Sequence, residues 1–326
     1  MPQSVTIICA AWNESANLAQ TLTLITNLKY DDPLEILVCA GGDDDTYAIA
    51  SQFCPQITLL RQLPDDGKQK AVERCLAVAT GEIIVFYDGD VLVNQASFQW
   101  LIEPILAGDE QVTTGVGRPL PEQIDQQFVR YQWVFQEHRQ TANPAQYTHS
   151  VLGRNFALTR TVFEHAWPQT QARINEDFLI GLSIGEAGYR IRYVRESYVE
   201  TDYPEAFWTY VRQTNRGLRA NILVGQMLNK PQLVRDGFIT GTIGLIGLLI
   251  PLASLILGPI GVVLWLIAWG LVAKRRTHYM RFRNELEGSN YPLVGWGLLK
   301  FMLASFVAWS WLWFQLLHPS WRTKWM

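Results

Sequence analysis

Two aspartates separated by one glycine, Asp88-Gly89-Asp90, are the residues best suited to chemistry in this chain of 326 residues. They follow an apolar run, so the first aspartate closes an expected strand and the glycine permits a turn after it. Such a turn brings both carboxylates toward one point. Paired carboxylate oxygens suit a hard cation, Mg²⁺ or Mn²⁺, which can also hold a substrate diphosphate. A solvated acidic turn is the alternative for the motif alone.

Two further charged positions stand at the starts of expected helices. Lys68 follows Gly67, and a cation beside the N–H groups of a helix start favours a bound anion; a surface lysine is the simpler interpretation. Asn175-Glu176-Asp177 opens another helix. Asp177 there either interacts with the helix dipole or acts as a general base, ionised at neutral pH with an ordinary pKa of ~3.9.

The elements that must position these side chains alternate between strand and helix. Strands are expected at Val5–Ala11, Glu35–Ala40, Ile57–Leu60 and Glu82–Tyr87. One helix is expected to be capped by Asn13 or Ser15 and to run through Leu28, and two more are expected at Thr46–Phe53 and Lys68–Thr80. This order predicts a doubly wound α/β sheet. Because ligands bind such sheets beyond the carboxyl ends of the strands, the expected site comprises Asn13-Glu14, Gly41–Asp45 and Asp88–Asp90.

The pattern is less regular after residue 110. Helices are expected at Phe128–Arg139 and Glu176–Ala187, and strands at Ser150–Leu158 and Arg190–Val194. The segment Pro204–Leu228 is amphipathic and mixes arginines with aromatic side chains. That mixture is typical of a helix at a membrane surface, and a helix packed on the domain is the alternative.

Charged residues are absent from Phe238–Ala273. One helix of this length would measure ~54 Å, against a hydrocarbon core of ~30 Å, and Gly258-Pro259 near its middle is a turn signal. We therefore expect a cytosolic domain over residues 1–230, with interfacial helices at its end, and a membrane domain over residues 236–326. The expected spans are residues 238–257, 259–273 and 293–317.

Orientation follows from the cations of the membrane domain. Lys274-Arg275-Arg276 favour the cytosol at the end of the second span, by the positive-inside rule. Three spans leave the C-terminus outside, whereas Arg322 and Lys324 favour the inside, and a re-entrant first hairpin is the alternative. No basic segment precedes the first strand, so we expect no signal peptide. The expected protein is multi-pass with a cytosolic catalytic domain, with a bacterial inner membrane favoured.

Composition argues against two other classes. The net charge is -3 and no basic stripe occurs, which disfavours a nucleic-acid partner. The four cysteines, Cys9, Cys39, Cys54 and Cys75, form no CxxC pair. We therefore expect reduced thiols and no structural zinc.

Five segments, taken together and in order, resemble a family 2 glycosyltransferase over about residues 5–225. They are Val5–Glu14 (VTIICAAWNE), Gly67–Asp90 (GKQKAVERCLAVATGEIIVFYDGD), Gly153–Arg160 (GRNFALTR), Asn175–Tyr189 (NEDFLIGLSIGEAGY) and Arg212–Ala220 (RQTNRGLRA). The resemblance implies a GT-A fold, with a mostly parallel sheet flanked by helices. It also implies an inverting transfer of a hexose from a nucleotide-activated sugar.

The resemblance assigns roles by position. Asp88 and Asp90 match the metal and diphosphate motif, and Lys68 matches a lysine near the donor. Glu14 matches an acidic residue near the nucleotide, and Asp177 matches the catalytic base. Gln213 and Arg216 match the first two fixed positions of the QxxRW motif; with Glu176 and Arg219 they are expected to bind acceptor or phosphate groups.

Three departures from the family pattern qualify these roles. Ala10 and Trp12 replace the usual Pro and Tyr at the end of the first strand. Ala40 stands where the family's uracil-contacting Asp is found, so that Asp43, Asp44 or Asp45 must substitute. Gly217 replaces the Trp of QxxRW, which favours a single-addition enzyme over a processive synthase.

The resemblance thus implies a metal-dependent, membrane-bound transferase. Its expected donor is a nucleotide sugar, with a UDP-sugar favoured, and its acceptor is a hydroxyl of a membrane lipid or lipid-linked saccharide. A polyprenyl-phosphate sugar synthase is the nearest alternative, since a phosphate acceptor needs no base. An inactive sugar-nucleotide-binding scaffold is the alternative of another class; Ala40 favours it, and the acids at positions 88, 90 and 177 count against it.

Overall fold

The computed structural model describes residues 3–141, 146–170 and 175–316. The chain folds into two compact units. Unit 1 comprises Met1–Leu120 and Arg139–Asp202, and unit 2 comprises Pro121–His138 and Tyr203–Met326. The expected division into a cytosolic and a membrane domain concerns the bilayer, so it stays a prediction. Arg322 and Lys324 lie outside the described residues.

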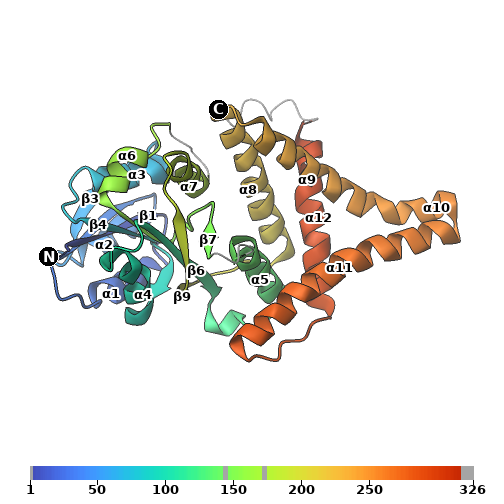
Figure 1. The fold of residues 1–326 in the computed structure, drawn as a ribbon, viewed down its shortest axis with the longest axis horizontal. Coiled ribbons are helices and arrows are strands. Elements are labelled where there is room, and N and C mark those ends of the chain that lie inside the picture. Colours follow the sequence, from blue (N-terminus) through green and yellow to red (C-terminus); the bar gives the residue numbers. More distant parts are fainter. Residues whose placement is uncertain (1–2, 142–145, 171–174, 317–326) are drawn as a thin grey trace. The chain divides into compact units, whose positions relative to one another are not determined.

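Unit 1 is built on one mixed sheet with the order β3-β2-β1-β4-β8-β6-β9-β5, and β7 pairs with β9 (Figure 1). The strands are β1 (Val5–Trp12), β2 (Leu34–Gly41), β3 (Thr58–Arg61), β4 (Ile83–Asp88), β5 (Val91–Val93), β6 (Val112–Pro119), β7 (Tyr147–Thr148), β8 (Asn155–Thr159) and β9 (Ile191–Thr201). Strands β3, β2, β1 and β4 are mutually parallel, as expected. Strand β8 then pairs with β4 in the antiparallel direction, so the other half of the sheet is mixed.

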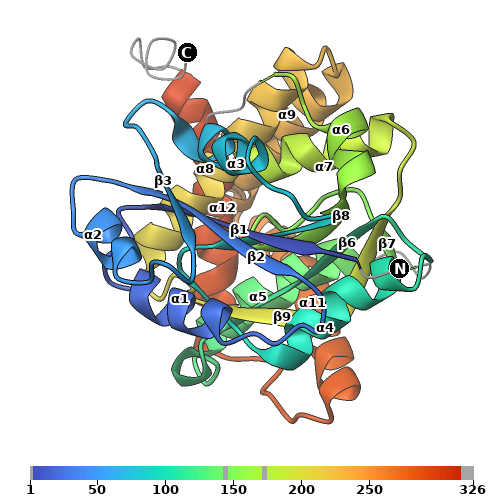
Figure 2. The same cartoon turned by 90° about the vertical axis from the view of Figure 1, so that its left-hand side faces the viewer.

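Helices cover both faces of this sheet (Figure 2). They are α1 (Leu18–Thr26), α2 (Thr46–Ser51), α3 (Gly67–Leu76), α4 (Gln95–Leu106), α6 (Arg160–Ala166) and α7 (Glu176–Glu186). Because side chains alternate along a strand, Ile7 faces the core that includes Phe98 of α4. Its neighbour Ile8 faces the opposite core, which includes Val72 of α3 and Ile180 of α7. The predicted α/β architecture is confirmed.

Several element ends differ from the sequence prediction. Helix α1 begins at Leu18, because Asn13 takes a positive φ of 58° and Asn13-Glu14 belong to the turn after β1. Strand β8 begins only at Asn155. Strand β9 runs on to Thr201, where its end pairs with β5 and with the end of β6. Such nonlocal pairing leaves no pattern in the strand's own residues.

Unit 2 is helical in the part that the structure describes. Its elements are η1 (Pro121–Gln123), most of α5 (Gln127–Thr141), α8 (Phe207–Met227), α9 (Pro231–Leu249), η2 (Ile250–Leu252), α10 (Ala253–Leu257), α11 (Pro259–Glu287) and α12 (Trp296–Leu316). An aromatic core joins α5, α8, α11 and α12 around Trp133, Tyr210 and Phe301. Within it Arg283 pairs with Glu137 at 2.6 Å and lies 3.8 Å from the ring centre of Trp133.

Two helical segments of unit 2, Pro231–Leu257 and Trp296–Gln315, are long and apolar enough to cross a bilayer. This criterion rests on length and composition, which a packed core helix also satisfies. The apolar window of the first is 12% buried and that of the second 50%. The expected span over residues 259–273 forms the first half of α11 and does not meet the criterion.

Candidate active site

The carboxyl ends of β1, β2 and β4 meet at one edge of the sheet, since the three strands are parallel neighbours. Glu14 follows β1, Asp43–Asp45 follow β2, and Asp88 is the last residue of β4. Strand β8 runs the other way, and its first residue, Asn155, pairs with Tyr87. The residues just before β8, Gly153-Arg154, therefore come to the same edge. The topology therefore gathers acids and cations from four segments.

The turn after β4 depends on Gly89. A Cβ at this position would lie 2.8 Å from Cβ of Ala11 on the neighbouring strand, so a larger residue would push β4 and β1 apart. The glycine lets the chain leave the sheet directly after Asp88 and enter β5 at Val91. Asp88 and Asp90 are both half-buried at this edge.

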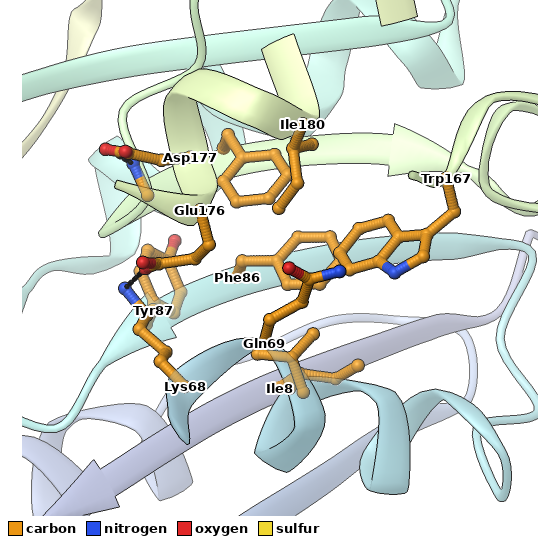
Figure 3. Close-up of a pocket in the computed structure, with 12 residues that line it drawn as sticks. Ile8, Lys68, Gln69, Phe86, Tyr87, Trp167, Glu176, Asp177 and Ile180 are labelled. Atoms are coloured by element: carbon orange, nitrogen blue, oxygen red, sulfur yellow. Dashed lines mark hydrogen bonds and ion pairs between the residues drawn. The ribbon is translucent and has the colours of Figure 1, made fainter. Parts of the chain in front are cut away.

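Lys68 joins the start of α3 to two acids. Its Nζ lies 2.5 Å from Oδ1 of Asp88. It also lies 3.2 Å from Oε1 of Glu176 (Figure 3). Gly67, with a φ of +64°, begins the helix just before it. Burial lowers the pKa of Lys68, but the charges of Asp88 and Glu176 outweigh this and raise it overall. The lysine is therefore a permanent cation, and it links the end of β4 to the start of α7.

Asp177 lies beside this cation at the start of α7. Its carboxylate accepts hydrogen bonds from N–H of Phe178 at 2.8 Å and of Gly153 at 3.4 Å. Burial and the charge of Glu176 raise the pKa of Asp177, and Lys68 partly opposes this. A carboxylate whose pKa is shifted toward neutrality is a stronger general base than an ordinary aspartate.

Gly153 is a contact point between Asp177 and Lys68. A Cβ on it would lie 2.9 Å from Cβ of Asp177, 3.3 Å from Oδ2 of Asp177 and 3.3 Å from Nζ of Lys68. The absence of a side chain thus lets all three segments meet. Asn175, with a φ of 64°, turns the chain into α7 just before Glu176 and Asp177.

The carboxylates of Glu14, Asp88 and Asp90 lie close enough to repel one another. Burial and Asp90 raise the pKa of Asp88, while Lys68 and Arg154 lower it. Burial and then Asp90 raise the pKa of Glu14 to about 7. Neighbouring acids with raised pKa values favour a bound cation, because it relieves their repulsion.

The donor atoms at Asp88 and Asp90 fit a metal shared with substrate. Among the described residues, no cluster of three or more His, Cys, Asp and Glu side chains is arranged to hold an ion. Mg²⁺ commonly uses only one or two protein carboxylates, with water and phosphate oxygens completing the octahedron. Two aspartates beside a diphosphate would meet this requirement.

Asp44 links the loop after β2 to the turn after β1 by hydrogen bonds. Its carboxylate accepts hydrogen bonds from N–H of Ser15 at 3.1 Å and from Oγ1 of Thr46 at 2.6 Å. These bonds, above all that from Thr46, lower the pKa of Asp44 and connect the turns after β1 and β2. Asp43 and Asp45 are exposed in the same loop, and their part in donor binding stays a prediction.

Arg154 is a site residue that the sequence analysis did not single out. Its guanidinium donates a 2.9 Å hydrogen bond to Oγ1 of Thr201 at the end of β9. Burial raises the pKa of Asp88, and the positive charge of Arg154 partly opposes that rise. The only sequence signal was its place in GRNFALTR, directly before a strand. Its proximity to Asp88 depends on the antiparallel pairing of β8 with β4.

The remaining predicted residues lie on α8 of unit 2. Gln213 and Arg216 are exposed there, whereas Arg219 is buried, and burial lowers the pKa of Arg219 to about 10. Their assignment to acceptor or phosphate groups stays a prediction.

An apolar pocket lies between α3, β4 and α7, behind Lys68, Glu176 and Asp177 (Figure 3). Its wall includes stacked rings of Phe86 and Phe156, with centroids 4.2 Å apart. Trp167 closes the far end and donates a 3.3 Å hydrogen bond to Oε1 of Glu73. These aromatic rings thus pack directly behind the polar cluster of Lys68, Glu176 and Asp177.

A sheet with acids at the carboxyl ends of its parallel half, continued by antiparallel strands and by a helix that starts with further acids beside the same site, is typical of the GT-A class of glycosyltransferase. The chain belongs to the family described as "Glycosyltransferase like family 2", whose profile matches residues 2–220. The family, the fold and the enzyme class expected from the sequence are thereby confirmed.

Known proteins with similar sequences are glycosyltransferases. The probable glycosyltransferase YdaM of Bacillus subtilis (strain 168) is 26% identical over 234 residues, which cover 67% of this chain and 55% of YdaM. Glucosyl-3-phosphoglycerate synthase of Mycobacterium tuberculosis (strain ATCC 25618 / H37Rv) is 30% identical over 127 residues, 36% of this chain and 39% of that enzyme. The chain thus spans about half or less of the length of these relatives.

One solved structure resembles the chain over nearly its whole length. The mannosyltransferase PcManGT from Pyrobaculum calidifontis, in complex with GDP-Man and Mn²⁺, aligns with a TM-score of 0.58 and 17% identity. The alignment covers 96% of this chain and 87% of that one. This likeness supports the fold.

Proposed function

We propose that the protein transfers a sugar, with inversion, from a nucleotide-diphosphate donor to a hydroxyl of a membrane lipid or lipid-linked saccharide. The observation that carries this proposal is the position of Lys68, which pairs with Asp88 on one side and Glu176 on the other. A diphosphate motif and a base are thereby held within one small cluster. An inverting transfer needs the diphosphate-binding group and the base on opposite faces of one anomeric carbon, so both must lie close together.

Asp88 and Asp90 would hold Mg²⁺ or Mn²⁺. When bound, such an ion neutralises charge on the departing nucleotide diphosphate. Lys68 and Arg154 supply further positive charge beside Asp88. Glu14, in the turn after β1, would contact the nucleoside.

Asp177 acts as the base in this proposal. It accepts the acceptor's hydroxyl proton as the oxygen attacks the anomeric carbon, on the face opposite the leaving diphosphate. Its carboxylate is held by two backbone N–H groups, so its direction is fixed before substrate arrives. Preorganisation of this kind supports base catalysis.

A UDP-sugar is the favoured donor on the family resemblance. Ala40, fully buried in β2, offers no side-chain oxygen to a nucleobase. Asp43 and Asp45, exposed in the following loop, are the acids that remain close in sequence. Uracil recognition would then depend on that loop.

Attachment to a membrane is supported by the apolar surface of unit 2. Exposed side chains include Leu255 at 82%, Ile256 at 86% and Ile260 at 67%, and contiguous apolar surface of this kind marks contact with lipid or protein. Lys274 and Arg275 follow on α11 and favour the cytosolic side. A bilayer contact on the cytosolic face, as at a bacterial inner membrane, suits an enzyme whose acceptor is a lipid.

Lipid extracts from cells that produce the wild-type protein or Asp90→Asn test the function. We expect a glycolipid in the wild-type extract, detected by mass spectrometry, that is lost with the variant at equal protein level. Identical extracts would contradict the proposal and favour the inactive scaffold. Asp177→Asn separates the acceptor classes, since a polyprenyl-phosphate acceptor needs no base and its transfer would be nearly unaffected.

A further inference from the structure

Helix α12 is the central packed helix of unit 2. Phe301, Phe306 and Leu312 are buried along it, at 0%, 3% and 0% exposure. Helix α9 packs on it through glycines: a Cβ on Gly244 would lie 2.6 Å from the backbone nitrogen of Ser310. A helix enclosed in this way has less apolar surface to offer to lipid than its composition suggests.

Helix α8 crosses α12 near its middle and carries charge there. Tyr210 hydrogen-bonds to Ser305 at 3.2 Å, and Asn215 donates to the carbonyl of Ala308 at 2.9 Å. Ser305 and Ala308 lie ~14 and ~18 Å from the start of α12 at about 1.5 Å per residue, half-way through a ~30 Å core. If α12 crossed the bilayer, the exposed Arg212 and Arg216 of α8 would lie near that depth, where arginine is strongly disfavoured.

The hairpin of α9, η2, α10 and α11 extends beyond these contacts (Figure 1). Near its base the hairpin contacts Phe306 of α12: a Cβ placed on Gly247 would lie 2.6 Å from the Phe306 side chain, and the ring centres of Trp269 and Phe306 are 5.4 Å apart. Between residues 248 and 268, Gly261 is the only described residue that is buried. This tip, residues 248–268, therefore carries a continuous part of the exposed apolar surface of the unit, including Leu255, Ile256 and Ile260.

The length of the tip matches half of a bilayer. About ten residues in each arm extend ~15 Å at the helical rise, and the whole hydrocarbon core is ~30 Å thick. The uncharged part of α11, residues 259–273, reaches only ~22 Å before Lys274. The arm is thus too short for a full crossing.

We propose that the tip, residues 248–268, inserts into one leaflet of the bilayer and that α12 does not cross it. Helices α8 and α12 then lie at the level of the headgroups, with the chain entering and leaving on one side. This inference rests on the membrane attachment proposed above and narrows it to a one-sided contact.

Cations at the base of the tip fit an anionic leaflet. Lys274 and Arg275 are exposed directly after the apolar arm. Each cation near an anionic surface strengthens binding about fivefold. The double variant Lys274→Gln with Arg275→Gln should therefore bind vesicles containing phosphatidylglycerol roughly 25-fold more weakly; equal binding would overturn this part of the proposal. Lys29→Gln, on the exposed surface of unit 1, is the matched control.

Single cysteines at the two ends of α12 test the topology. Cys54 is the exposed native cysteine and Cys9, Cys39 and Cys75 are buried, so Cys54→Ser gives the background. Trp296→Cys and Phe314→Cys mark exposed side chains at 85% and 61%, Ile256→Cys marks the tip, and Asp31→Cys marks unit 1. The full chain in sealed membrane vesicles is treated with a membrane-impermeant maleimide.

We expect positions 31, 296 and 314 to react from the same side and position 256 to react from neither side until detergent is added. Reaction of positions 296 and 314 from opposite sides would overturn the inference while leaving membrane attachment intact. Reaction of position 256 from the far side would show a full crossing and overturn it equally. Release of the wild-type protein from vesicles by an alkaline wash would instead contradict the attachment itself.

Discussion

Nζ of Lys68 lies 2.5 Å from Oδ1 of Asp88, at the junction of α3 with the end of β4. The same ammonium group is 3.2 Å from Glu176, so one cation couples the proposed diphosphate motif to the segment that carries the proposed base, Asp177. Many of the expected effects of substitution depend on this coupling.

Replacing Lys68 by Met should weaken binding of a nucleoside diphosphate about 10- to 100-fold. The expected loss corresponds to a charged hydrogen bond worth ~1.5–3 kcal/mol, since Lys68 would also contact the phosphates. Lys68→Arg keeps the charge and should recover part of the affinity. Calorimetry with UDP and GDP in the presence of Mn²⁺ measures both; wild-type affinity in Lys68→Met would refute a role in donor binding.

Asp177→Asn should reduce turnover by ~10²–10⁴-fold, the usual contribution of a positioned base. Binding of nucleotide should change little, because the proposed role of Asp177 is toward the acceptor.

The pKa of Asp177 should also depend on Glu176. Burial makes the largest contribution to the raised pKa of Asp177, and the negative charge of Glu176 raises it further. The acid limb of kcat/KM should therefore move to lower pH in Glu176→Gln, and a limb that stays in place would argue against Asp177 as the titrating base.

Stability should depend on pH through Glu14. Its pKa is raised from 4.5 to about 7, first by burial and then by Asp90, so the folded state holds this proton more tightly than the unfolded chain. The resulting stabilisation is complete below pH ~4.5 and is lost as pH rises through ~7. Urea unfolding between pH 5 and 8 should show a shallower decline in Glu14→Gln than in wild type; parallel curves would contradict the assignment.

Gly153→Ala should abolish most activity with little loss of stability. The added Cβ would lie 2.9 Å from Cβ of Asp177, so Asp177 or the loop before β8 must shift, and small misplacements cost ~10²-fold in rate. Gly185→Ala is the matched control in α7, where a Cβ meets nothing within 4 Å. Equal activity of the two variants would mean that the loop adjusts freely.

In unit 2, Gly244→Ala should lower the free energy of unfolding by ~1–3 kcal/mol through overpacking. Its Cβ would lie 2.6 Å from Cβ of Trp309 on α12. Gly270→Ala on α11 meets nothing within 4 Å, and should stabilise by ~0.5–1 kcal/mol from helix propensity. Thermal unfolding in detergent compares them, and a neutral Gly244→Ala would show that α9 and α12 are not closely packed.

The parallel half of the sheet could be predicted because each strand carries its own signal. Val5, Ile7 and Ile8 belong to a run that is apolar on both faces, as a central parallel strand requires. The acids of the site stand at strand ends, and parallel neighbours share an edge, so their meeting followed from local pattern alone.

Other parts depend on contacts that no local pattern records. Arg154 comes near Asp88 only because β8 pairs with β4 in the antiparallel direction. The buried state of α12 arises from the glycines of α9 and the side chains of α8, while its own composition equals that of a membrane span. The sequence pattern shows how hydrophobic a helix is. It does not show which neighbouring helices cover that helix, because this depends on the packing of the folded unit.

Binding of a nucleoside diphosphate with and without Mn²⁺ tests the central claim most directly. Calorimetry with UDP and GDP should show wild-type binding that depends on Mn²⁺, lost in Asp90→Asn and weakened in Lys68→Met. Binding of neither nucleotide under any condition, or equal binding by wild type and Asp90→Asn, would contradict the assignment of this strand edge as the donor site.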